Sequence, residues 1–122
     1  MIVLDTNILI EVLKANKKTI EKVQSFTDEL VISSITVMEL YYGALNKAEL
    51  KEIEKFVLLF NVFHVTEQVS IKSTELIFKY AKSHTLDIPD SLIASTALVL
   101  EAKIFTYNRK DFQYIDGLTL IE

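Results

Sequence analysis

Short apolar runs rich in β-branched residues alternate along this chain with longer segments of helical periodicity. The strand-like runs occupy residues 2–4, 29–33, 61–66, 103–107 and 118–121. Between them, apolar side chains recur at the three- and four-residue spacing of amphipathic helices. Consecutive parallel strands need a crossover connection, and the helices of that connection cover the faces of the sheet. The alternation therefore predicts an α/β fold with a mainly parallel central sheet.

The helical segments are predicted between these strands. One ends near Leu45 with Gly43 inside it, and Ser33, Ser34 and Thr36 are all suitable N-caps for it. The stretch from 7 to 26 is compatible with one bent helix or with two. The other segments cover residues 48–60, 67–82 and 90–102. With two Gly and one Pro in 122 residues there is little room for a linker, so we expect one domain over residues 1–122.

The composition excludes several kinds of chemistry. The chain has no Cys, so disulfides, thiolate nucleophiles and Cys-based zinc sites are absent, and His64 and His84 lack the close pairing of a zinc motif. A bound metal would need oxygen ligands, which favours Mg²⁺ or Mn²⁺. No signal peptide and no run long enough to span a bilayer is visible, so we expect a cytoplasmic protein with no membrane partner.

Four acidic residues lie at or near places where helical segments begin. Asp5 directly follows the first apolar run, and Asp111 follows a later one. Glu39 lies three residues after Thr36, in the spacing of a capping box, and Asp90 precedes an apolar helix. Taken singly, each acid is explained by an ordinary helix cap.

Taken together, the same acids predict a metal site. Strand ends that lead into helices lie at one edge of a parallel sheet, where the ligands of such folds bind. Carboxylates that meet there repel one another unless cations screen them. One or two metal ions held in this way suit phosphodiester hydrolysis, because they acidify a bound water and stabilise charge on oxygen. The net charge of −4 argues against a basic nucleic-acid binder, but cations in such a site offset part of it.

At these residues the chain resembles the PIN-domain ribonucleases, and most closely the VapC toxins of VapBC toxin–antitoxin pairs. The segments that carry the resemblance occur in the family's order and span nearly the whole chain. They are Leu4-Asp-Thr-Asn7, Ile35-Thr-Val-Met-Glu-Leu-Tyr-Tyr-Gly43, Ile88-Pro-Asp-Ser-Leu-Ile-Ala-Ser-Thr-Ala97 and Thr106-Tyr-Asn-Arg-Lys-Asp-Phe112.

The resemblance implies a PIN-like three-layer α/β/α sandwich and an endoribonuclease that depends on one or two Mg²⁺ or Mn²⁺ ions. It implies that Asp5 and Asp90 are the principal metal ligands and that Glu39 binds the metal or its water. The resemblance leaves two positions for the fourth acid, because some relatives carry it where this chain has Asn108 and others at the later Asp. We expect Asp111 to be the fourth acid and Asn108 to be a polar supporting group. Asp87 competes with Asp90, but Asp90 directly precedes the Ser-Leu-Ile-Ala-Ser-Thr-Ala run that the family places after its ligand.

The resemblance also implies supporting residues and partners. Thr6 and Asn7 would support Asp5 or contact the scissile phosphate, and Arg109 is a candidate for binding RNA phosphates. The expected partners are RNA, a second copy in a homodimer, and a small VapB-like antitoxin. That antitoxin would place a helix or extended segment, often with an Arg, in the acidic groove.

Other readings of the same residues compete with this one. Haloacid-dehalogenase-type phosphatases need a second acid where this chain has Asn7, and response-regulator receivers need an Asp at the end of the third strand, where residues 61–66 have none. The remaining alternative is a catalytically silent PIN-like module for RNA binding or assembly.

Overall fold

Four short strands form a wholly parallel sheet in the order β3-β2-β1-β4. In the computed structural model, which describes residues 1–122, the strands are β1 (Ile2–Leu4), β2 (Leu30–Ser33), β3 (Asn61–Phe63) and β4 (Lys103–Phe105). The predicted last strand at 118–121 is wrong as an extended strand, because only Leu120 pairs, through a bridge to Ile104. The third strand ends at Phe63, three residues earlier than predicted.

Six α-helices connect these strands, and one short 3₁₀ helix follows the last of them. They are α1 (Thr6–Leu13), α2 (Lys17–Ser25), α3 (Ser34–Tyr42), α4 (Lys47–Val57), α5 (Glu67–His84), α6 (Ile88–Leu100) and the 3₁₀ helix η1 (Arg109–Asp111). The stretch from 7 to 26 is two helices, since Ala15 takes a left-handed φ of 61° and the Asn16 side chain caps α2. α3 ends at Tyr42, so Gly43 is its C-cap and is not inside the helix as predicted.

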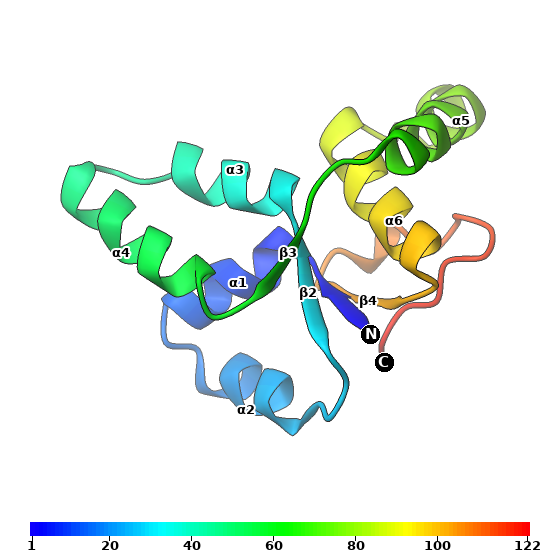
Figure 1. The fold of residues 1–122 in the computed structure, drawn as a ribbon. Helices are drawn as coiled ribbons and strands as arrows, with labels where there is room; N and C mark the ends of the chain where they lie inside the picture. The colour runs from blue at the N-terminus through cyan, green and yellow to red at the C-terminus, as the bar shows by residue number, and fades with distance from the viewer.

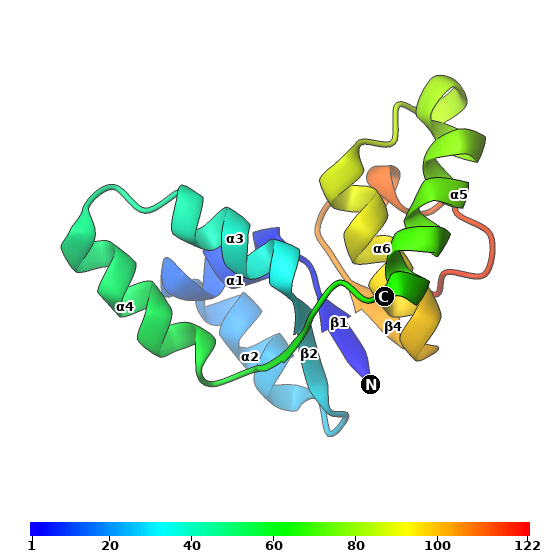
Figure 2. The ribbon, with the colours of Figure 1, turned by 45° about the horizontal axis from the view of Figure 1, so that its top comes forward.

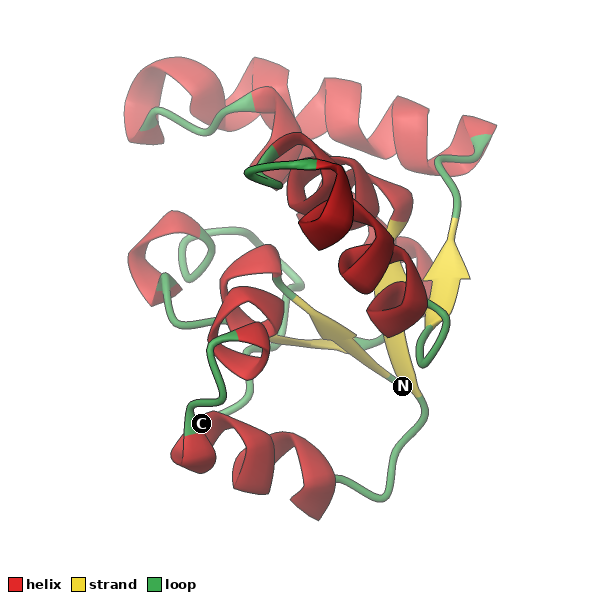
Figure 3. Cartoon of the chain, turned by 90° about the vertical axis from the view of Figure 1, so that its left-hand side faces the viewer, coloured by secondary structure: helices red, strands yellow, loops and turns green.

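The helices cover both faces of the sheet and complete a three-layer α/β/α sandwich. Helices α1 to α4 pack on one face, and α5 and α6 pack on the other (Figures 1 and 2). Figure 3 shows the strands enclosed among the helices. Because side chains alternate along a strand, Ile2 and Leu4 enter the core beneath α1 to α4, whereas Val3 enters the core beneath α5 and α6. No helix is both long enough and apolar enough to cross a membrane.

The strand order places a ligand crevice beside β1. The chain moves outward from β1 to β2 and β3 and then returns to add β4 on the other side of β1. In parallel sheets, ligands bind outside the carboxyl ends of strands at such a reversal. Asp5 directly follows β1 and Thr106 directly follows β4, so both lie at this reversal.

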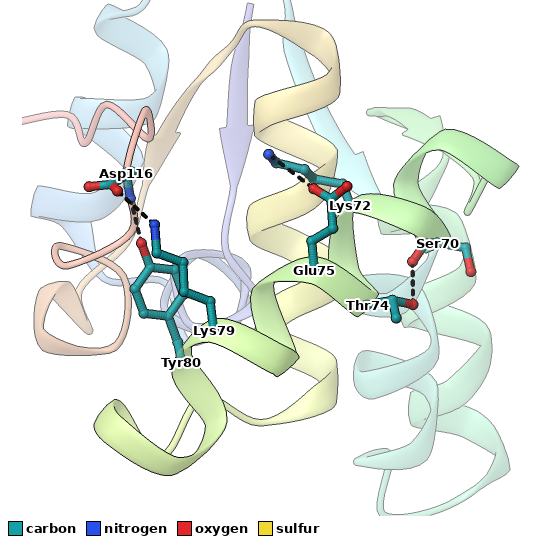
Figure 4. A network of polar contacts seen from close by, with 7 residues as sticks. All are labelled: Ser70, Lys72, Thr74, Glu75, Lys79, Tyr80 and Asp116. Carbon is teal, nitrogen blue, oxygen red and sulfur yellow. Dashed lines mark hydrogen bonds and ion pairs between the residues drawn. The ribbon is translucent and has the colours of Figure 1, made fainter.

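The segment after η1 is fastened to α5. Figure 4 shows Lys79 and Tyr80 reaching Asp116: the Lys79 Nζ lies 2.9 Å from the Asp116 Oδ2, and the Asp116 backbone N–H donates to the Tyr80 hydroxyl at 3.2 Å. The His84 ring stacks on the Tyr114 ring, with centroids 4.1 Å apart. These contacts hold the chain that follows Asp111.

Candidate active site

Asp5 is both a helix cap and the buried acid at the centre of the site. Its Oδ1 accepts a hydrogen bond from the Thr6 backbone N–H at 2.8 Å, and its Oδ2 accepts one from the Thr106 hydroxyl at 2.7 Å. Burial raises the pKa of Asp5, the bonds from Thr106 and Thr6 lower it, and the carboxylates of Glu39 and Asp111 raise it further. Both carboxylate oxygens are therefore fixed in position while negative charge gathers around them.

Glu39 joins this group through Thr6. Its Oε1 accepts a hydrogen bond from the Thr6 hydroxyl at 2.8 Å, and that hydroxyl lies 3.0 Å from the Thr36 hydroxyl. The predicted capping box of Thr36 and Glu39 is wrong, because Ser33 caps α3 by accepting from the Ile35 N–H and Thr36 is already inside the helix. Glu39 therefore has no capping role, and its carboxylate instead binds the Thr6 hydroxyl.

Asp90 lies in the first turn of α6 but does not cap it. The helix begins at Ile88, and Asp87 is the N-cap, with its Oδ1 accepting from the Asp90 N–H at 2.9 Å. This corrects the prediction that Asp90 begins the helix. Burial raises the pKa of Asp90 to about 7, with further contributions from the carboxylates of Asp87, Asp5, Asp111 and Glu39, in that order. Asp90 therefore shares the electrostatic environment of the other three acids.

Asp111 lies at the end of η1, where its exposed carboxylate contributes to raising the pKa of Asp5 and of Asp90. It also acts on Tyr114, whose hydroxyl is buried without a hydrogen-bond partner. Burial, and then Asp111 and Asp90, raise the pKa of that tyrosine. The structure thus brings Asp111 to the same group as Asp5, Glu39 and Asp90.

The residues between β4 and η1 have different partners. The Asn7 side chain accepts from the Tyr107 N–H at 3.3 Å and donates to the Thr106 hydroxyl at 3.4 Å, so it joins α1 to the chain after β4. The Asn108 backbone N–H also donates to the Thr106 hydroxyl, at 3.0 Å. Arg109 donates to the Ile121 carbonyl at 2.7 Å, so its contacts do not support a role in phosphate binding.

Sequence reasoning missed Thr106 as a site residue. Its hydroxyl donates to Asp5 and accepts from the Asn108 backbone, so it sets the orientation of the central carboxylate. The sequence feature that could have identified Thr106 is its position directly after a strand, at the same sheet edge as Asp5.

The donor chemistry of this group fits a hard divalent cation. The candidate ligands are carboxylate oxygens, which Mg²⁺ and Mn²⁺ prefer. Burial is the main cause of the raised pKa values of Asp5 and Asp90, and neighbouring carboxylates, whose charge a cation would offset, raise them further. No three acidic or imidazole side chains are yet close enough to hold an ion. Such open spacing is favoured while the carboxylates repel one another.

The sequence of this chain matches one protein family and is similar to ribonucleases of two bacteria. Residues 2–118 match the family described as PIN domain. The chain is 34% identical to Ribonuclease VapC1 of Haemophilus influenzae (94% of this chain, 92% of the relative). It is 31% identical to the tRNA(fMet)-specific endonuclease VapC of Salmonella typhimurium (96% and 93%).

Solved structures agree with these relatives. The chain superposes on VapBC-1 from nontypeable Haemophilus influenzae with a TM-score of 0.84 at 33% identity, covering 100% of this chain and 98% of that one. The match to VapBC2 from Rickettsia felis has a TM-score of 0.86 at 26% identity, covering 99% and 98%.

Proposed function

The chain belongs to the PIN-domain family, and from this premise we propose that it is a divalent-metal-dependent endoribonuclease, the toxin of a VapBC-type pair. The carrying observation is the group of Asp5, Glu39, Asp90 and Asp111, four acids from separate parts of the chain that act on one another at the reversal of the sheet. All four acids are present, so nothing favours the catalytically silent alternative. We also propose a cytoplasmic location, where RNA is available.

The side chains have distinct tasks in this proposal. Asp5, Asp90 and Glu39 hold one or two Mg²⁺ or Mn²⁺ ions, with Asp111 as the fourth acid. A bound ion would supply an acidified water and stabilise charge on the phosphate oxygens. Thr106 and the Thr6 backbone keep the Asp5 carboxylate in one orientation, and the Thr6 hydroxyl does the same for Glu39. Asp90, with a pKa of about 7, must release its proton to bind a cation.

The first test removes the central acid. We expect wild-type protein to cleave RNA with Mg²⁺ or Mn²⁺ and Asp5→Asn to lose this activity, because the amide cannot replace the charge that holds the ion. The measurement is cleavage of a panel of tRNA, ribosomal RNA and messenger RNA. Asp28→Asn is the matched control, since Asp28 lies in an exposed position before β2. Equal cleavage by Asp5→Asn, or by wild type in excess EDTA, would contradict the proposal.

An antitoxin is the second proposed partner, and the structure offers a groove for it. The groove lies between α1, α3 and α4 and has a volume of about 580 Å³. Apolar Ile10 and Leu13 line it together with Glu39, Glu49 and Glu52. We propose that an antitoxin segment with apolar and cationic side chains covers it. Glu52→Lys should weaken binding of the protein encoded by the adjoining reading frame in calorimetry, and an unchanged affinity would count against this groove.

A homodimer is the third proposal. Phe78 is 93% exposed and Ile71, seven residues earlier on α5, is 55% exposed. Large apolar side chains exposed together mark an interaction surface. We propose that a second copy covers this surface. Light scattering should then show a dimer that Phe78→Ser dissociates, and a monomeric wild type would refute it.

A further inference from the structure

Tyr107 lies next to the acidic group without belonging to it. It directly follows Thr106, whose hydroxyl binds Asp5, and its backbone N–H donates to the Asn7 side chain at 3.3 Å. The residue is 48% exposed. Tyr42 and Phe78 are more exposed than Tyr107, but no hydrogen bond joins either of them to a residue of the site.

The Tyr107 ring is held in place before any ligand arrives. Its hydroxyl lies 2.6 Å from the hydroxyl of Thr19, which is fully buried in α2. The ring also packs edge to face with Phe105, with centroids 5.5 Å apart at 75°. Since the hydroxyl is occupied by a buried partner, the exposed surface belongs mainly to the ring. A side chain ordered in advance loses little conformational entropy when a ligand binds to it.

Two lysines adjoin the residue that holds this ring. Lys17 and Lys18 are exposed in the first turn of α2, immediately before Thr19, and neither forms an ion pair. In a chain of net charge −4, these are cations free to contact phosphates beside an acidic centre. The ordered ring therefore connects Thr106, whose neighbouring hydroxyl binds Asp5, with the first turn of α2, which carries two lysines without ion pairs.

We propose that Tyr107 is a stacking platform for one unpaired nucleotide next to the scissile phosphate, with Lys17 and Lys18 contacting the neighbouring phosphates. Single-stranded RNA is recognised by stacking of its bases on aromatic rings combined with cations along its backbone, and both elements are present here. This proposal rests on the proposed ribonuclease function and adds the way in which the substrate is held.

The binding test uses the absence of Trp from the chain. In the Asp5→Asn background, which prevents cleavage, Tyr107→Trp introduces a single fluorescent indole, and Leu58→Trp, at the exposed C-cap of α4, is the matched control. An adenosine heptamer should quench the indole at 107 and leave the control unchanged. A ribose-phosphate chain of equal length without bases should quench neither. No quenching at 107 with millimolar heptamer, or equal quenching by the chain without bases, would overturn the platform.

The kinetic test separates this platform from catalysis. Tyr107→Ala should raise KM for RNA roughly five- to a hundredfold, the range for loss of one stacked base, and leave kcat within a few-fold. Tyr107→Phe keeps the ring and should remain close to wild type. An unchanged KM for Tyr107→Ala in a protein that still needs Mn²⁺ would overturn the platform and leave the ribonuclease function intact. Metal-independent cleavage would instead overturn the function, and the fluorescence test would still decide the platform.

Discussion

At the residue scale, the site depends on the hydroxyl of Thr106. A buried carboxylate is stable only when its oxygens have partners, and Asp5 has one partner for each oxygen. The partner of Oδ1 is the first backbone N–H of α1, which only a proline at position 6 would remove. The partner of Oδ2 is a side chain from the far end of the chain, at residue 106. A single substitution at Thr106 should therefore change both the hydrogen bonding and the pKa of Asp5.

Replacing Thr106 with Val should therefore destabilise the protein at neutral pH. The substitution leaves one oxygen of a buried carboxylate without its donor, which costs about 1–3 kcal/mol. It should also raise the pKa of Asp5 further, because the lost hydrogen bond lowers that pKa. Urea unfolding and the pH dependence of Mn²⁺ binding would measure the two effects. Thr106→Ser keeps the hydroxyl and should restore both, whereas wild-type values in Thr106→Val would show that the bond does not support Asp5.

At the element scale, the first turn of α6 divides two tasks between two neighbouring acids. Asp87 caps the helix from outside, and Asp90 lies within the first turn with its carboxylate unbound by any donor in the protein. Pro89 fits this arrangement, since the first turn needs no N–H donor at that position. Because Asp87 supplies the cap, Asp90 is available for a cation.

Because the two acids have different tasks, substitutions in this one turn should affect different properties: stability at Asp87 and RNA cleavage at Asp90. Asp87→Ala should lower the free energy of unfolding by about 0.5–2 kcal/mol through loss of the cap, and should keep metal-dependent cleavage. Asp90→Asn should keep the cap and lose cleavage. Urea unfolding and RNA cleavage would be measured on both variants, with Asp87→Ser as the control that retains a capping oxygen. Loss of cleavage in both Asp87→Ala and Asp87→Ser would show that Asp87 is itself a ligand.

At the scale of the whole molecule, the converging acids make metal-free stability depend on pH. The pKa of Asp90 is raised from 3.8 to about 7 in the folded state, so the folded protein holds this proton more tightly than the unfolded chain. The contribution of Asp90 to stability is therefore present in full below pH 3.8 and is lost as the pH rises to about 7. Asp5, whose pKa is also raised, acts in the same direction.

Thermal unfolding should reveal this dependence and its reversal by metal. Without metal, Asp90→Asn should have a higher Tm than wild type at pH 8, and this difference should disappear in acid. Mn²⁺ should raise the Tm of wild type, because an ion that binds only the native state stabilises it. The rise should be larger at pH 8 than at pH 5, since deprotonated carboxylates bind the ion. No shift of Tm at millimolar Mn²⁺ would contradict metal binding by these carboxylates.

The sequence by itself determined the local properties of this protein. Periodicity predicted the α/β class, the parallel sheet and the approximate place of the helical segments, because strands and amphipathic helices place apolar residues at different spacings. It left open whether residues 7–26 form one helix or two. Residue chemistry and order along the chain identified Asp5, Glu39, Asp90 and Asp111. The absence of Cys restricted any metal ligands to oxygen and nitrogen donors.

Only the tertiary structure decided which groups touch. The bond from Thr106 to Asp5 joins residues 101 positions apart, and the bond from Thr6 to Glu39 joins residues 33 apart. The same holds for Arg109, which donates to the Ile121 carbonyl, and for Tyr107, which is held by Thr19. Local patterns carry no information on such pairs, because strand order and helix packing set them. Those long-range contacts orient two of the four acids, Asp5 and Glu39.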